Sequence, residues 1–313
     1  MALSLDFAFE GFRVIRQKPK LILFWGLALI IINIGMMVLM QTVFASTMSD
    51  IQAVSASAGS NPSAALTAFQ QIGQKILPLE GVFVPLGLAT GAILNCAVFR
   101  AALEYKNDSF GYLRFGADEL RQLGITILFF LMFIVVEIAA AIAGLVVGGV
   151  FGLILSFVSK PLAGLGFLVG TLVALGGIIW YAVRMSLFGV IALDRKTIDL
   201  FASFGLTKGQ FWSLFVGYVV MFLMALVVMI LFMVVVFAIT SALGGGGNSA
   251  MLGTVMGARG QGLSAFTNPA TIVSLVITNG ILSPLLIALM GGAPAAAYKA
   301  LGGVTRRSAA QVF

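Results

Sequence analysis

Six long apolar runs constrain this chain more than any other feature. A helix needs about 20 apolar residues to cross a bilayer, and six runs approach or exceed that length: 21–45, 81–99, 122–159, 162–193, 211–243 and 272–297. The third and fifth runs are longer than a bilayer requires, so we expect them to tilt or to extend beyond it. The runs predict an all-α integral membrane protein whose residues 1–313 form a single transmembrane domain.

The composition excludes most soluble functions. Hydrophobic residues make up 60% of the chain and charged residues only 9%, whereas soluble domains carry roughly 25% charged residues. The chain has no histidine and one cysteine, Cys96, so the usual ligands of zinc, haem and iron–sulfur centres are missing. We therefore expect no catalytic residue, no metal and no cofactor, and we interpret Cys96 as a small packing residue.

The basic residues predict the orientation. Fifteen of the 18 bases lie in the N-terminal segment, the C-terminal segment and the connections after the second and fourth runs. Lys75, Lys160 and Arg259 lie on the opposite side. The positive-inside rule then places both termini in the cytoplasm. The net charge of +7 is thus explained by the membrane, and we expect no nucleic-acid partner. The first run begins after Lys20 and is too long for a cleaved signal peptide.

An amphipathic segment precedes each odd-numbered run, which divides the chain into three helical hairpins. The segments are residues 4–18, 109–123 and 197–208. The first has an apolar face, and we expect all three to lie as helices at the cytoplasmic interface. Residues 61–77 are expected to form a further short polar helix. Two interpretations stay open: a true threefold repeat, or independent segments that every cytoplasmic edge attracts. The expected apolar face of the first segment is Leu5, Ala8, Phe9, Phe12 and Ile15.

A base ends each even-numbered run. These bases are Arg100, Arg184 and Lys299. If the three hairpins surround a common axis, the bases would converge on one anionic lipid headgroup. The alternative is that each base extends outward to headgroups on its own. The sequence therefore offers a tentative lipid or anion site without deciding its geometry.

Glu137 is the one acid inside a run. A buried carboxylate in hydrocarbon needs a partner or a water-filled cavity. It is either a proton or cation site, or a structural residue that is protonated or paired with a base such as Arg184. By contrast, Asp118 and Glu119 lie near Arg114 and Arg121, and we interpret them as a solvated ion-pair face.

Glycines spaced by four residues mark the third and fourth runs. Such spacing lets helix backbones approach closely, so we expect these two runs to pack on each other; the alternative is a dimer interface. The glycines are Gly144, Gly148, Gly152, Gly166 and Gly170. Prolines 85, 284 and 294 are expected to interrupt the second and sixth runs.

Three segments resemble a known group of proteins. They are LTKGQFW at 206–212, FGYLRFGADELR at 110–121 and PAAAYK at 294–299. They are similar to segments of uncharacterised bacterial membrane proteins named for the membrane domain of glycerophosphoryl diester phosphodiesterases. The resemblance extends loosely over most of the chain and implies a six-helix bundle in the inner membrane. It supplies no catalytic residue, because the phosphodiesterase domain with its metal ligands is not in this sequence.

The sequence favours a non-enzymatic accessory or scaffold subunit that interacts with anionic lipid or a membrane complex. The expected partners are membrane lipids and either other membrane proteins or further copies of the chain. A transporter or channel for a small or lipid-like solute is the alternative, and an enzyme that acts on lipid comes third.

Overall fold

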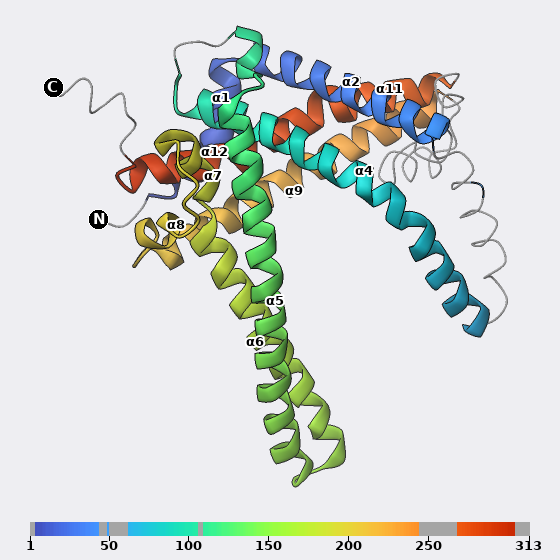
Figure 1. Ribbon diagram of the computed structural model, residues 1–313, viewed down its shortest axis with the longest axis vertical. Helices are drawn as coiled ribbons and strands as arrows, with labels where there is room; N and C mark the ends of the chain where they lie inside the picture. Colours follow the sequence, from blue (N-terminus) through green and yellow to red (C-terminus); the bar gives the residue numbers. More distant parts are fainter. Residues whose placement is uncertain (1–3, 44–48, 50–61, 106–108, 244–267, 304–313) are drawn as a thin grey trace.

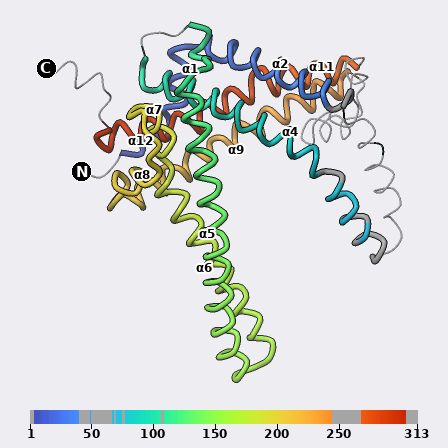
Figure 2. The backbone as a smooth tube through the Cα atoms, in the orientation of Figure 1, coloured from blue at the N-terminus to red at the C-terminus, as the bar shows by residue number. Residues whose placement is uncertain are grey.

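The computed structural model describes residues 4–43, 49, 62–105, 109–243 and 268–303, and these residues form helices joined by short loops, with no strand among them (Figures 1 and 2). The elements are η1 (Leu5–Phe9), α1 (Glu10–Gln17), α2 (Lys20–Val43), α4 (Pro62–Ala102), η3 (Ser109–Tyr112), α5 (Ala117–Ser156), η4 (Lys160–Ala163), α6 (Gly164–Met185), α7 (Phe188–Arg195), α8 (Ala202–Leu206), α9 (Phe211–Ala242), α11 (Pro269–Ile277), η7 (Thr278–Leu282) and α12 (Ser283–Ala300).

Six helical segments of the described residues are long and apolar enough to cross a membrane, which confirms the predicted all-α multi-pass fold. They are Lys20–Leu39, Leu77–Ala102, Ser109–Ser156, Lys160–Arg195, Phe211–Ala242 and Pro269–Ala300. The polar helix expected over 61–77 is present, but it continues without a break into the second span as the first part of α4.

The spans diverge from one packed region, which we call the hub: η1, α1, α7, α8, η3 and the adjoining ends of α4, α5, α9 and α12. From the hub, α2, α4, α9 and α11 extend to one side, and the hairpin of α5 and α6 extends in another direction (Figure 1). We call this hairpin the α5–α6 arm. The first and last described helices meet in the hub, because α1 packs on α12. Both described ends of the chain therefore lie at the same end of the molecule.

The hub is built on close backbone contacts and small side chains. A Cβ added at Gly292 of α12 would lie 2.7 Å from the backbone nitrogen of Gly11 in α1, a distance that real Cβ atoms do not reach. Trp25, Val98 and Leu214 are fully buried around this contact and come from three different spans. The hub thus forms the main apolar core from which the spans extend.

The first amphipathic segment is helical, and the predicted apolar face is partly wrong: Ala8 is buried and Ile15 packs against the core, as expected, but Leu5 and Phe9 are not buried. Phe7, Gly11 and Val14 are buried in their place. The segment does not contact only the membrane surface. It packs on α12 and α9, and Phe7 lies against Gly217 of α9 and edge-on to Tyr218. Packing inside the protein therefore decides which residues are buried.

The other two interfacial helices differ from the prediction. Residues 109–123 begin with the single turn η3, continue as extended chain and enter α5 only at Ala117. The segment 197–208 holds only the short helix α8. Asp199 accepts hydrogen bonds from the backbone nitrogens of Phe201 and Ala202, each at 3.1 Å. The three units are therefore not alike in the structure, which does not support a regular threefold repeat of these segments.

The predicted packing of the third and fourth runs holds the α5–α6 arm together. A Cβ added at Gly144 would lie 2.5 Å from the carbonyl oxygen of Gly170, and one at Gly148 would lie 2.7 Å from that of Gly166. Gly152 lies opposite Ala163 and Gly166 at the far end of the seam. The glycines thus pack α5 against α6 within one chain. The two backbones can approach this closely because glycine has no side chain.

Prolines interrupt the spans less than expected. α4 continues through Pro78 and Pro85, and α12 continues through Pro294. The sixth span departs from α-helical geometry just before Pro284, where Thr278–Leu282 form a π-helical turn. A π turn lets a helix absorb the missing hydrogen bond of a proline that follows it.

Candidate functional site

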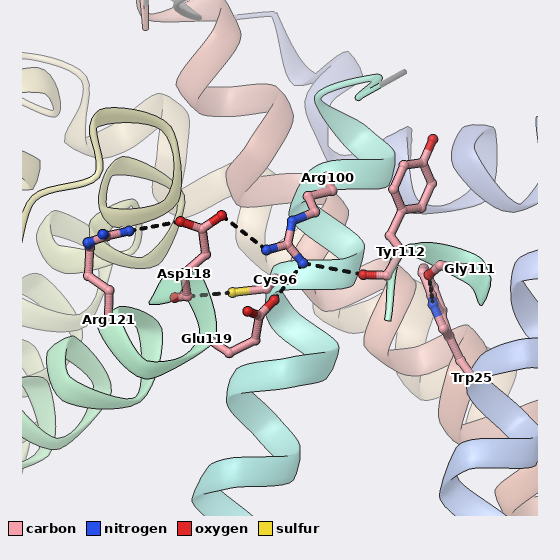
Figure 3. A network of polar contacts seen from close by, with 8 residues as sticks. All are labelled: Trp25, Cys96, Arg100, Gly111, Tyr112, Asp118, Glu119 and Arg121. Atoms are coloured by element: carbon pink, nitrogen blue, oxygen red, sulfur yellow. Dashed lines mark hydrogen bonds and ion pairs between the residues drawn. The ribbon is translucent and has the colours of Figure 1, made fainter. Parts of the chain in front are cut away.

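The strongest polar cluster lies in the hub around Arg100, at the end of α4 (Figure 3). One guanidinium nitrogen lies 2.6 Å from a carboxylate oxygen of Glu119, and the other lies 3.2 Å from one of Asp118. Asp118 also pairs with Arg121 at 2.9 Å. Arg100 and Glu119 are only 2% and 3% exposed. We call these four residues the Arg100 cluster.

A left-handed loop brings the two halves of the cluster together. Phe110, Gly111 and Tyr112 have φ values of 49°, 66° and 63°, a region that L-residues seldom adopt in succession. Hydrogen bonds from other elements hold them there. Trp25 of α2 donates to the Gly111 carbonyl at 2.7 Å, and Arg100 donates to the Tyr112 carbonyl at 3.3 Å. The loop therefore couples α2, α4 and α5.

The buried side chain of Tyr112 extends this coupling to the N-terminal segment. Its hydroxyl accepts a hydrogen bond from Lys18 at 2.6 Å and donates one to the Tyr105 carbonyl at 3.0 Å. Tyr112 is fully buried. Sequence reasoning missed its role, because the residue falls in a segment that was expected to be an ordinary amphipathic helix.

The Arg100 cluster acts as an internal clamp. Its two bases and two acids carry no net charge, so it has no excess charge with which to attract an anion. The prediction that Asp118 and Glu119 form a solvated face is wrong for Glu119, which is buried on Arg100. Buried ion pairs of this kind fix the relative position of elements, since each charge needs its partner.

The three bases that end the even spans do not share a site. Arg184 donates to the Phe204 carbonyl at 2.9 Å and lies over the rings of Trp180 and Phe204. Lys299 donates to the Ala102 carbonyl at 2.6 Å and lies 3.5 Å from Glu104. Because each base has its own partners, the structure does not support convergence on one headgroup, one of the two alternatives left open by the sequence, and Arg100 is too buried to meet a lipid.

Glu137 lies exposed on the outer surface of α5. The predicted structural pair with Arg184 is wrong, since the guanidinium of Arg184 is bonded to Phe204. Among the described residues Glu137 has no hydrogen bond or ion pair. It therefore stands as an acid on an apolar surface and does not line a path between packed helices.

Two further groups complete the hub. Phe129 stacks on Phe188 with centroids 4.6 Å apart and on Tyr181 at 5.9 Å, which joins the base of the α5–α6 arm to α7. The hydroxyl of Tyr298 donates to buried Asp194 at 2.7 Å and joins α12 to α7. The Tyr298–Asp194 pair was not predicted, because its residues lie 104 positions apart in the chain.

The described side chains offer packing and ion pairing rather than a metal centre. Among them no group of three or more histidine, cysteine, aspartate or glutamate residues is placed to hold a metal ion. Cys96 is fully buried, and its sulfur lies 3.8 Å from the Asp118 carbonyl. Its position agrees with the role of a packing residue.

Compared with known proteins, the chain matches no family model, no curated protein and no solved structure. The resemblance to the phosphodiesterase membrane-domain group stays a prediction.

Proposed function

We propose that the protein is a non-catalytic accessory or scaffold subunit of the bacterial inner membrane, with both termini in the cytoplasm. The observation that carries the proposal is the α5–α6 arm. Beyond the hub its two helices pack on each other and diverge from the other spans (Figure 1). A multi-pass protein whose spans separate in this way offers faces to other membrane helices.

The physics of helix association in lipid supports this use of the arm. Lipid tails are as apolar as leucine, so helices associate through close packing and hydrogen bonds rather than through the hydrophobic effect. The inner faces of the arm already pack on each other through the glycine seam, which consists of Gly144, Gly148 and Gly152 on α5 and Gly166 and Gly170 on α6. Its outer faces remain available to a partner, and large apolar side chains cover them: Leu145, Val146, Val150, Leu168 and Leu172.

The surface of the hub supports contact with anionic lipid. Phe115 and Trp212 are 77% and 72% exposed, and Lys196 and Lys208 are exposed on the same set of connecting segments. Exposed aromatics beside bases are typical of the cytoplasmic membrane interface, where rings insert between headgroups and bases attract their phosphates. These residues replace Arg100 and Arg184 as the proposed lipid contacts.

The transporter alternative requires polar side chains along a path between spans. Glu137, the proton or cation candidate from the sequence, lies on an outer surface. One polar contact joins two spans, because the side-chain amide of Asn33 in α2 donates to the side-chain oxygen of Asn279 in η7 at 2.9 Å. Since the two side chains bond each other, this contact supports helix packing rather than a path.

Photo-cross-linking in native membranes tests the proposal. A photoreactive residue is placed in turn at the exposed positions Leu145, Leu168 and Leu172, and as an internal control at buried Ile125. We expect protein adducts of discrete mass from the arm positions and only intramolecular products from Ile125.

Adducts to lipid alone at all three arm positions would contradict a scaffold role. Extraction into polymer-bounded native nanodiscs gives a second reading. The mass of the particle protein should exceed that of a single 32.9 kDa chain.

A further inference from the structure

The outer face of α5 carries one acid in an otherwise apolar surface. Glu137 lies near the middle of the 40-residue helix, about 30 Å from its beginning and about 28 Å from its end at 1.5 Å per residue. The exposed residues within about two turns on the same side are Phe130, Ile134, Ala141 and Leu145. We call this surface the Glu137 face.

A carboxylate in this position needs a partner. Hydrocarbon cannot solvate its charge, so an acid inside a span is either protonated or paired with a base or hydrogen-bond donor, and the ionised form of Glu137 requires such a partner. Arg121, the nearest other charged residue on α5, lies 16 positions earlier and is bonded to Asp118. The helix itself thus supplies no base to Glu137.

The rest of the described chain does not supply the partner either. Arg184 is the base closest to the middle of a span, and its guanidinium is bonded to Phe204. Along the seam Gly144 lies opposite Gly170 and Gly148 opposite Gly166, so Glu137 is level with residue 177 of α6, and Arg184 lies seven residues, about 10 Å, nearer the hub. Arg100 is buried between two acids. The exposed lysines Lys20 and Lys160 lie at the ends of their spans, so a second copy of the chain would bring another Glu137 and no base from the described spans at the same depth.

We propose that the Glu137 face is the docking site for a transmembrane helix of a different protein, one that carries a lysine or arginine at the depth of Glu137. The inference rests on the proposed scaffold function and names the class of partner. Ala141, one turn beyond Glu137, is small enough to let the partner backbone approach. Phe130 and Ile134, its apolar neighbours on this face, keep lipid and water from the charge pair, which strengthens it in a low-dielectric environment.

Charge exchange tests this pairing. A photoreactive residue at Ile134, one turn before Glu137, reports contact with the partner in native membranes, and peptide mapping of the adduct identifies the partner segment. We expect a span with a lysine or arginine beside the cross-linked position. Glu137→Asp should keep the adduct, whereas Glu137→Leu and Glu137→Lys should reduce its yield by about tenfold or more, as the loss of a hydrogen-bonded pair in lipid implies. Replacing the partner's base with glutamate should restore the adduct with Glu137→Lys.

A matched control moves the acid to another exposed position of the same helix. The double variant Glu137→Leu with Val135→Glu keeps the charge of α5 and places the acid on a different side. It should lose the adduct like the single variant. Because Glu137 makes no described contact within the chain, these variants should unfold at the temperature of the parent.

The outcomes separate the two proposals. Three results would overturn the inference: an adduct with a second copy of this chain, a partner span without a base, or an adduct yield that Glu137→Lys does not change. In each case, protein adducts at Leu168 and Leu172 would still support the scaffold function. The absence of protein adducts from the whole arm would overturn both.

Discussion

At the scale of single residues, the Arg100 cluster decides how the hub is assembled. Arg100 and Glu119 lie 19 positions apart in the chain, on two different helices, and each is buried against the other at 2.6 Å. Removing one partner leaves the other charge buried without compensation, which is far more costly than losing a solvent-exposed pair.

We therefore expect Arg100→Gln to lower the free energy of unfolding by about 3–5 kcal/mol. Arg121→Gln, which removes the more exposed partner of Asp118, should lower it by less than about 1 kcal/mol. Steric trapping in bicelles measures both values. Equal losses in the two variants would show that burial of the Arg100–Glu119 pair does not matter.

The residues of this cluster could be found in the sequence, but their pairing could not. Arg100 and Asp118–Glu119 stand out as charges near the ends of apolar runs. Their contact depends on the turn at Phe110–Tyr112, where three consecutive residues are left-handed. Only one of the three is glycine, so the usual signal for such a conformation is weak. Hydrogen bonds from distant Trp25 and Arg100 stabilise the turn, and local sequence rules do not include them.

At the scale of helices, the glycine seam decides that α5 and α6 form one arm. Here the sequence was sufficient, because glycines at intervals of four predict contact between helices that a short turn connects. The seam also provides a matched pair of positions. An added Cβ at Gly148 would lie 2.7 Å from the Gly166 carbonyl oxygen, whereas one at neighbouring Gly149 meets nothing within 4 Å.

Gly148→Ala should accordingly destabilise the arm by about 1–3 kcal/mol, as overpacking does in other well-packed sites. Gly149→Ala should be neutral or stabilising by up to about 1 kcal/mol, since alanine favours a helix more than glycine. Thermal unfolding in detergent shows which of the two variants is more stable. If both variants behave alike, α5 and α6 do not meet along this seam.

At the scale of the whole molecule, the number of spans was predictable and their arrangement was not. α9 is apolar on every side, so periodicity cannot tell which face packs inward. The same limit explains the partly wrong face assigned to residues 4–18, where contact with α12 overrides the amphipathic pattern.

The orientation of the molecule is a prediction of the basic residues. A reporter fused after Phe313 should be cytoplasmic, and one inserted at Gly246 should lie on the opposite side; both positions lie outside the described residues. The end of α9 at Ala242 and the end of α12 at Ala300 lie at opposite ends of the molecule (Figure 1), as this topology requires. Reporter activity on the same side at both sites would contradict it.

The central claim is that the α5–α6 arm separates from the other spans and leaves its outer faces to partners. The most direct measurement is the distance between spin labels at Phe157, just beyond α5, and Leu243, just beyond α9, in a Cys96→Ala background in lipid nanodiscs. The two helices are about 60 Å and 48 Å long at 1.5 Å per residue and diverge from the hub (Figure 1). The account predicts a separation of more than about 30 Å between the labels. A separation near the roughly 10 Å of directly packed helices would mean that the spans form a closed bundle, and would contradict it.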